Sequence, residues 1–190
     1  MLYFLGRSIY YIIYKTLYRL KIEGRDNIPP GTGYIIASNH NSYADPPLVG
    51  ACLKQPVYFM AKKELFKIPV LGWLISKVHA YPVDRSAPRP SSIKKSIQML
   101  REGKVILIFP KGTRRKDAEI QSGLSLLAHK SGVPVVPSRI FNNYDMRRFH
   151  PLKYKIGKPV NFPRKPDEKS DSDTYRQFAA EIMDRINSIK

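Results

Sequence analysis

Hydrophobic residues along the chain follow two different spacings, which predict strands that alternate with helices. Short apolar runs next to turn residues predict strands at 34–38, 57–60, 80–83, 105–109 and 135–140, with a weaker strand at 154–156. Apolar positions at helical spacing predict helices at 46–53, 91–102, 123–131 and 174–189, and the polar stretch 163–173 predicts a surface loop. This alternation predicts an α/β fold in which a mixed, mostly parallel sheet is flanked by helices.

The first 22 residues predict an amphipathic helix ahead of one larger domain at residues 23–190. One face gathers Leu2, Leu5, Ile9, Ile12, Ile13 and Leu20, and the opposite face gathers Arg7, Lys15 and Lys21 with Tyr10, Tyr11, Tyr14 and Tyr18. Charges interrupt the segment before it reaches the roughly 20 apolar residues that cross a bilayer, and its pattern does not match a secretory signal. We expect the helix to lie flat on a membrane, with tyrosine rings and cations at the headgroups; the alternative is a helix packed on its own domain.

Composition narrows the class of protein and its partners. The 190 residues fit one compact domain, and 43% hydrophobic with 25% charged residues exclude a disordered, collagen-like or multi-pass membrane chain. A net charge of +18, from 33 Lys+Arg against 15 Asp+Glu, attracts nucleic acid, anionic lipid or phosphorylated substrates. The single cysteine, Cys52, excludes an intramolecular disulfide and any CxxC site, and its apolar neighbours predict a buried, inert thiol.

The segment 38–46 carries the first candidate chemistry, directly after a predicted strand. His40 precedes Asp45 by five residues, and ligand sites of open α/β sheets gather at the carboxyl ends of strands. A carboxylate on one imidazole nitrogen fixes the tautomer, so the other nitrogen can take a proton from a substrate hydroxyl. A regular helix would hold the two side chains roughly 140° apart, so a bend is required. The alternative is a purely structural His–Asp pair.

Two further segments place basic side chains just beyond predicted strands. Arg85 follows the third strand, and the sequence FPKGTRR at 109–115 follows the fourth. Pro110 and Gly112 predict a turn, and a turn with arginines and open backbone N–H groups can bind phosphate. Solvated surface cations are the alternative. The last segment, VPVVP at 133–137, predicts a core strand.

Together and in this order, the four segments resemble the motifs of the 1-acylglycerol-3-phosphate acyltransferase family of glycerolipid acyltransferases. That family carries NHxxxxD, an Arg-bearing block at a strand end, FPEGTR and a VPVxP-like block; the corresponding segments here are NHNSYAD, VDR, FPKGTR and VPVVP. The resemblance covers roughly residues 20–160. It implies the glycerol-3-phosphate acyltransferase-like fold, with no metal and no bound cofactor. It also implies transfer of a fatty acyl group from acyl carrier protein or coenzyme A thioester to the sn-2 hydroxyl of lysophosphatidate, which gives phosphatidate.

The resemblance also implies roles for single residues. It makes His40 the general base on the acceptor hydroxyl and Asp45 its orienting partner. The substrate-binding positions that it implies, with the arginines on the acceptor phosphate, are Asn39, Arg85, Lys111, Gly112, Thr113 and Arg114. Lys111 stands where the family has Glu, so it either adds a third cation at the phosphate or signals a different acceptor.

The same residues predict a mechanism without a covalent intermediate. No GxSxG elbow occurs, so we expect the acceptor hydroxyl to attack the thioester directly, with His40 as the base. Backbone N–H groups near Asn41 are candidate donors to the oxyanion. The alternative enzyme acts on another acceptor, glycerol-3-phosphate or a different lyso-lipid.

Charge and apolar surface predict the partners and the location. We expect an anionic membrane surface, lysophosphatidate, and acyl carrier protein or acyl-CoA as partners, with the protein peripheral or monotopic on the cytoplasmic face of the cell membrane. The apolar and lysine-rich segment 62–77, which contains Trp73, predicts either a second docking surface or a buried helix. We expect no nucleic acid, because no zinc finger or RNA-recognition signature occurs; a non-enzymatic nucleic-acid-binding module is the alternative from another class.

Overall fold

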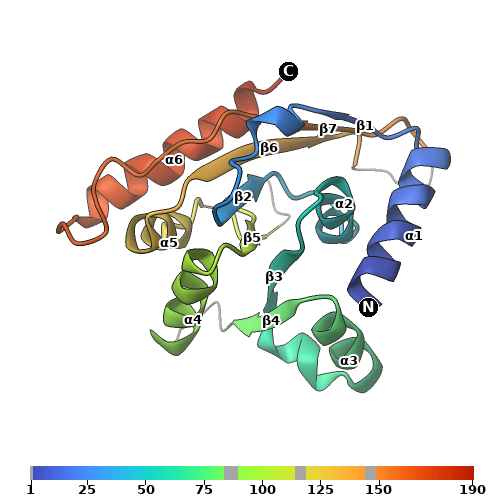
Figure 1. Ribbon diagram of the computed structural model, residues 1–190, viewed down its shortest axis with the longest axis horizontal. Helices are drawn as coiled ribbons and strands as arrows, with labels where there is room; N and C mark the ends of the chain where they lie inside the picture. The colour runs from blue at the N-terminus through green and yellow to red at the C-terminus, as the bar shows by residue number, and fades with distance from the viewer. Residues whose placement is uncertain (1, 84–89, 114–118, 144–148) are drawn as a thin grey trace.

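A seven-stranded sheet forms the centre of the molecule (Figure 1). A computed structural model describes residues 2–83, 90–113, 119–143 and 149–190. The strands follow the order β1-β7-β6-β2-β5-β3-β4, and every neighbouring pair is parallel except β6 with β7. Their bounds are β1 Lys21–Glu23, β2 Tyr34–Ser38, β3 Val57–Lys62, β4 Ala80–Val83, β5 Val105–Ile108, β6 Val135–Phe141 and β7 Lys153–Ile156. The predicted mixed, mostly parallel α/β sheet is confirmed.

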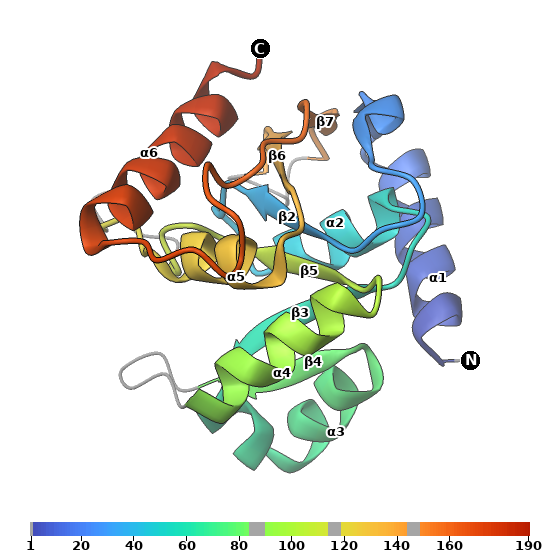
Figure 2. The same ribbon diagram turned by 60° about the vertical axis from the view of Figure 1, so that its left-hand side comes forward.

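Helices cover both faces of the sheet (Figures 1 and 2). They are α1 Leu2–Thr16, α2 Asp45–Cys52, α3 Pro69–Lys77, α4 Pro90–Arg101, α5 Gly123–Ser131 and α6 Ser172–Ser188, with 3-10 turns η1 Arg25–Asn27 and η2 Lys63–Lys67. Successive residues of β2 point to opposite faces, so Ile36 packs with the residues of α1 and α2, and Ile35 packs with those of α4, α5 and α6. Each face of the sheet therefore has its own hydrophobic core.

The amino-terminal helix is shorter than the sequence predicts. It ends at Thr16, Arg19 has a left-handed backbone with φ of 46°, and Lys21–Glu23 form the edge strand β1. Lys21 pairs with Lys153 of β7, which places this end of the predicted helix in the sheet. The prediction of a helix over the first 22 residues was wrong in its last part. The last residues of this segment pair with the distant strand β7 instead, which helical spacing does not reveal.

Two tyrosines of α1 pack against the protein instead of facing outward. Tyr3 and Tyr14 are buried, and their hydroxyls bond to backbone: the Val57 N–H donates to Tyr3 at 2.8 Å, and Tyr14 donates to the Ala44 carbonyl at 3.2 Å. Arg7 donates to a carbonyl of the loop after α2. Of the tyrosines predicted at lipid headgroups, Tyr14 is not there, since a backbone carbonyl partners its buried hydroxyl, whereas Tyr10 is exposed.

The aliphatic face of α1 is the outward one. Leu5 and Ile12 are 57% and 59% exposed. The other exposed large hydrophobic residues of the helix and its end are Leu2, Phe4, Ile9, Tyr10, Ile13 and Leu17. The helix thus turns its aliphatic side chains outward and packs Tyr3 and Tyr14 on the domain. In the described part of the chain, no helix is long and apolar enough to span a bilayer.

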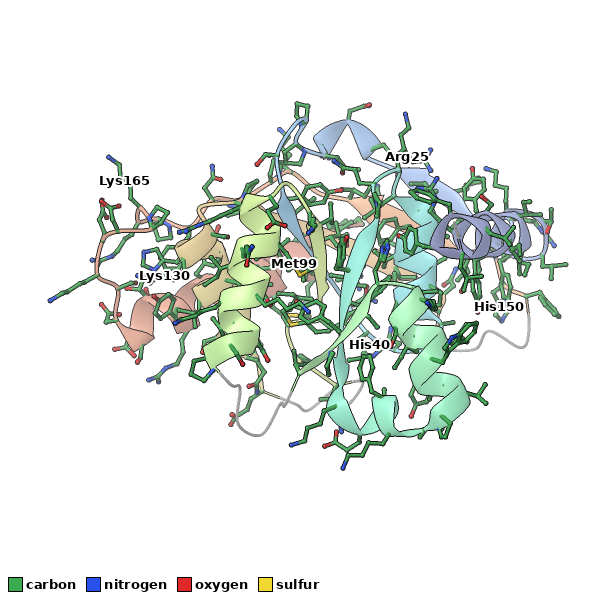
Figure 3. All side chains as sticks on the ribbon, turned by 60° about the horizontal axis from the view of Figure 1, so that its bottom comes forward. Arg25, His40, Met99, Lys130, His150 and Lys165 are labelled. Carbon is green, nitrogen blue, oxygen red and sulfur yellow. The ribbon has the colours of Figure 1, made fainter. Side chains whose placement is uncertain are left out.

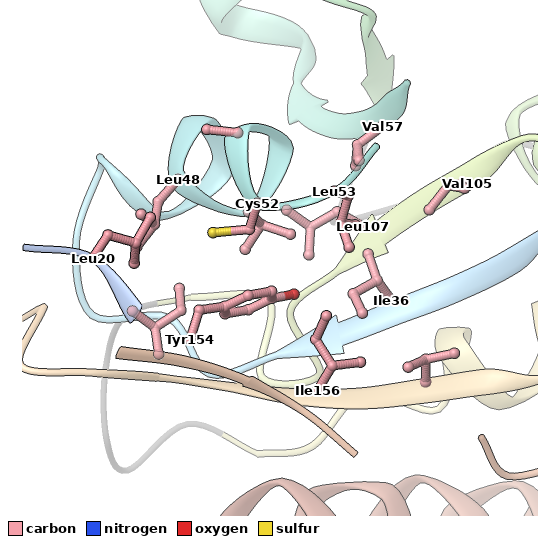
Figure 4. Packing of buried hydrophobic residues seen from close by; sticks show 14 of the residues in the cluster. Leu20, Ile36, Leu48, Cys52, Leu53, Val57, Val105, Leu107, Tyr154 and Ile156 are labelled. Carbon is pink, nitrogen blue, oxygen red and sulfur yellow. The ribbon is translucent and has the colours of Figure 1, made fainter. Parts of the chain in front are cut away.

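Cys52 is fully buried in the core under α2, near Leu48 and Tyr154 (Figure 4). Burial raises the pKa of its thiol far above the usual value, because the apolar surroundings disfavour the thiolate. We expect iodoacetamide at pH 8 to leave the native protein unmodified and to alkylate it after unfolding in guanidinium, as read by the mass of the intact chain. Rapid alkylation of the folded protein would contradict this burial.

Candidate active site

The carboxyl ends of β2 and β5 bring two of the predicted segments together. β2 lies in the middle of the sheet and pairs in parallel with both β5 and β6. Because the pairing is parallel, the loops that leave β2 and β5 emerge at the same edge. The segments 39–45 and 109–113 are therefore neighbours, although about 70 residues separate them in the sequence.

His40 and Asp45 form a hydrogen-bonded pair at this edge (Figure 3 labels His40). His40 Nδ1 lies 2.9 Å from Asp45 Oδ2, and the two side chains are 16% and 1% exposed. The same carboxylate oxygen accepts the backbone N–H groups of Asn41 at 2.7 Å and Ser42 at 2.8 Å. These bonds to Asp45 hold the bend that the spacing requires. Asp45 is also the first residue of α2, where the helix dipole favours a negative charge.

The hydrogen bond to Asp45 decides the chemistry of the imidazole. An ionised carboxylate only accepts hydrogen bonds, so Nδ1 carries the proton and Nε2 presents a lone pair. The His40 ring also stacks on Phe109, with centroids 4.0 Å apart and planes 14° apart. Both contacts fix the ring, so the predicted His–Asp partnership is confirmed as a geometry, and Nε2 is suited to accept a proton.

The backbone N–H groups near Asn41 have another function than the one expected. The N–H groups of both Asn41 and Ser42 donate to Asp45, as given above. They are used in holding the carboxylate, so they are poor candidates for stabilising an oxyanion.

Asn143 completes the surroundings of Asp45 and was missed by sequence reasoning. It is buried, its Nδ2 donates to Asp45 Oδ1 at 2.8 Å, and its Oδ1 accepts from Asn41 Nδ2 at 2.9 Å. It lies just beyond β6, whose carboxyl end reaches the same edge as that of β2. A polar pair, Asn142 and Asn143, after a predicted buried strand was the available signal.

Asn39 is engaged within the protein rather than turned to the open edge. Its Oδ1 accepts the Ile140 N–H at 2.7 Å, and its Nδ2 donates to the Ile140 carbonyl at 2.9 Å. These two bonds tie the end of β2 to β6 and aim the backbone that carries His40. The sequence predicted a substrate contact here, whereas both polar atoms of the carboxamide hold backbone.

The third segment forms the turn that Pro110 and Gly112 predict. The Gly112 N–H donates to the Phe109 carbonyl at 2.7 Å, Pro110 stands at the second position of the turn, and Gly112 has φ of 61°. Lys111, Gly112 and Thr113 are partly buried and follow Phe109 directly. The turn therefore lies beside His40, because Phe109 is the residue that stacks on the imidazole.

The two arginines of the expected phosphate site, Arg85 and Arg114, lie outside the described residues. Val83, the last residue of β4, ends three strands from β2, which is about 14 Å along the sheet. Thr113 ends the described turn next to His40. The last predicted segment is core: Val135 and Val136 are fully buried in β6. Among the described residues, no three His, Cys, Asp or Glu side chains gather as a metal site.

Comparisons with known proteins bear on this arrangement. A family model described as Acyltransferase matches residues 19–141, which include the His40–Asp45 pair and the turn after β5. A Bacillus subtilis (strain 168) protein named 1-acyl-sn-glycerol-3-phosphate acyltransferase is 35% identical over 181 residues, which are 90% of this chain and 91% of the relative. A chloroplastic protein of that name from Brassica napus is 35% identical over 63% of this chain, which spans 36% of that longer relative.

A solved structure has the same fold. The crystal structure of the 1-acyl-sn-glycerophosphate (LPA) acyltransferase PlsC from Thermotoga maritima superposes with a TM-score of 0.65 at 28% sequence identity, covering 95% of this chain and 78% of that one. Since the family model matches more than half of the chain and the Bacillus subtilis relative aligns over nearly all of it, the protein belongs to the acyltransferase family.

Proposed function

We propose that this protein transfers a fatty acyl group from a thioester to the sn-2 hydroxyl of lysophosphatidate and so makes phosphatidate. The observation that carries the proposal is the His40–Asp45 pair, which leaves Nε2 as a proton acceptor beside the turn at 109–113. Both relatives described above are named for acylation of 1-acyl-sn-glycerol-3-phosphate, and the PlsC structure is titled for the same activity.

The reaction follows from the chemistry of these groups. Nε2 of His40 takes the proton of the acceptor hydroxyl while the hydroxyl oxygen attacks the carbonyl carbon of the thioester. Asp45 stabilises the imidazolium that forms. The tetrahedral intermediate collapses as its C–S bond breaks, and the proton passes from Nε2 to the leaving sulfur. The donor is acyl carrier protein or coenzyme A thioester, and the reaction needs no further cofactor because a thioester is already activated.

We assign the remaining residues by chemistry. Arg85, Arg114 and Lys111 bind the acceptor phosphate, and Gly112 and Thr113 shape that pocket; cations beside a turn suit a dianion. Asn39 acts as a positioning residue, because its carboxamide already holds the Ile140 backbone.

Reversing the charge of Lys111 tests its place at the phosphate. We expect Lys111→Glu to raise KM for lysophosphatidate about tenfold, which corresponds to ~1.4 kcal/mol, because an anion then faces the phosphate. Lys111→Gln removes the charge without reversing it, so its KM for lysophosphatidate should lie between those of the native enzyme and Lys111→Glu. A Lys111→Glu enzyme with much improved turnover would show that the lysine is no phosphate ligand.

Removing the side chain of Asn143 tests the support of Asp45. In Asn143→Ala, Asp45 Oδ1 loses its donor, so we expect kcat to fall about tenfold, or ~1.4 kcal/mol, while KM for lysophosphatidate stays unchanged. Steady-state kinetics checks the split. Asn161→Ala, at an exposed asparagine, is the matched control. An equal loss in the control, or a change in KM alone, would refute a positioning role.

We also propose that the protein works at a membrane surface, on the cytoplasmic face of the cell membrane. The exposed aliphatic face of α1 and the surplus of 33 Lys+Arg over 15 Asp+Glu suit a bilayer with anionic lipid, which is typical of that leaflet. The acceptor lies in the same surface, so the enzyme meets it there.

One assay tests the proposed function as a whole. Labelled acyl-CoA and acyl carrier protein are each offered with lysophosphatidate, glycerol-3-phosphate and lysophosphatidylcholine. The proposal predicts phosphatidate as the main product from at least one donor. Preferred acylation of either other acceptor would replace the proposed substrate, and no acyl transfer to any would refute the activity.

A further inference from the structure

The segment from η2 to α3 presents a second apolar surface to the surroundings. Val70 and Trp73 are 80% and 59% exposed. We call this the α3 surface, and its exposed large hydrophobic residues are Leu65, Ile68, Val70, Trp73 and Leu74. The alternative of a buried helix in this segment is therefore wrong, and the apolar side chains need another partner than the domain's own core.

Local packing explains why these side chains point outward. α3 connects β3 to β4, the edge strand of the sheet. Gly72 is buried against η2, since a Cβ there would lie 2.4 Å from the Phe66 carbonyl oxygen. The small residue thus faces inward, and the large residues beside it in the sequence are left on the open side.

The charges around the α3 surface match one class of partner. Segment 62–77 carries four lysines and one glutamate, a net charge of 4 − 1 = +3. Lys62, Lys67 and Lys77 are exposed. Apolar residues with a tryptophan, bordered by lysines, suit the interface of a bilayer that contains anionic lipid, where each nearby cation strengthens binding.

The α3 surface lies next to the amino-terminal end of α1. The Tyr3 ring of α1 stacks on His79 with centroids 4.3 Å apart, and His79 in turn stacks on Tyr58 of β3 at 4.7 Å. His79 follows α3 by two residues, and α3 lies beside the beginning of α1 in both ribbon views (Figures 1 and 2). An aromatic stack thus links the beginning of α1 to β3 and to the residue that precedes β4, just after α3.

The α3 surface is also close to the catalytic edge. η2 begins where β3 ends, and β3 ends at the same edge of the sheet as β2 and β5. Contact of this surface with a bilayer would bring the edge that carries His40 toward the lipid in which the acceptor resides.

We propose that η2 and α3 form a second membrane-contact surface beside α1, which binds anionic bilayers with Trp73 at the level of the headgroups. The inference rests on the proposed function in one respect, since it explains how the site would reach an acceptor held in a membrane.

The chain carries its own probe, because Trp73 is its single tryptophan. With vesicles of phosphatidylglycerol and phosphatidylcholine, we expect its emission to shift to the blue and to be quenched by lipids brominated near the headgroup. Pure phosphatidylcholine, or high salt, should weaken both effects. Protein that sediments with anionic vesicles while the emission of Trp73 stays unchanged would overturn the proposal.

Substitutions on the α3 surface test its part in membrane binding. Val70→Ser combined with Leu74→Ser should weaken binding to anionic vesicles at least tenfold, whereas Ala180→Ser, on an exposed position of α6, should leave it unchanged. The unfolding temperature of each variant verifies folding. Equal binding by the double variant and the native protein would refute the α3 surface. If Trp73 shifts as expected but the acceptor assay shows no acyl transfer, the proposed function fails and the membrane surface stands.

Discussion

Replacing His40 with alanine is expected to lower kcat by at least about a hundredfold, the size of a general-base contribution. The variant has no Nε2 to take the proton of the acceptor hydroxyl, although the thioester remains an activated donor. Steady-state turnover of lysophosphatidate with the preferred acyl donor measures the effect.

The controls for His40→Ala separate chemistry from folding. The His40 side chain is 16% exposed, and its loss removes a hydrogen bond to Asp45 and a stacking contact with Phe109, so the unfolding temperature should fall modestly while the protein stays folded. Binding to anionic vesicles should be unchanged, since both proposed membrane surfaces lie outside the pair. Near-native turnover in a folded variant would remove His40 from the mechanism.

Replacing Asp45 with asparagine is expected to lower kcat by about 10²–10⁴-fold, the range from a lost general base to the wrong imidazole tautomer. Both carboxylate oxygens accept hydrogen bonds: Oδ2 from His40 and two backbone N–H groups, and Oδ1 from Asn143. An amide must turn its NH2 group toward one of these sets of donors. The imidazolium also loses its counter-charge.

The same substitution should reduce stability, because a buried group then has unmatched donors around it, at a cost of about 1–3 kcal/mol. Asp184→Asn, at an exposed aspartate of α6, is the matched control and should change neither turnover nor unfolding in urea. A fully active Asp45→Asn enzyme would mean that the carboxylate holds the loop but contributes nothing to proton transfer.

The order of strands and helices was largely predictable because the parallel strands β2, β3, β4 and β5 are each followed by a helical segment, which leaves a clear change of spacing in the sequence. β1 was not predictable: it has three residues, and its partner Lys153 is more than a hundred residues away. The predicted faces of α1 were partly right: the aliphatic residues up to Ile13 share the exposed side, but Leu20 lies buried beyond the helix and Tyr10 is exposed. The helical spacing alone could not predict which side packs on the domain. That depends on the hydrogen bonds of the Tyr3 and Tyr14 hydroxyls with the distant backbone groups of Val57 and Ala44.

The candidate site was predictable where its residues are local in sequence. His40 and Asp45 lie five residues apart, and Asp45 itself bends the loop between them, so residue types and spacing sufficed. Asn143 reaches the same carboxylate from 98 residues away, and only the pairing of β6 with β2 brings it there. The bonds of Asn39 were not predictable for the same reason, because its partner Ile140 belongs to that distant strand.

The proposed reaction depends on direct attack of the acceptor hydroxyl on the thioester, with His40 as the base. It is tested most directly in a single turnover with a radiolabelled acyl donor, in which protein-bound and lipid-bound label are separated over time for the native enzyme and for His40→Ala. We expect label to pass straight to phosphatidate in the native enzyme, with none on the protein, and almost no transfer in the variant. Label that accumulates on the protein before phosphatidate appears, or transfer at the native rate without His40, would contradict it.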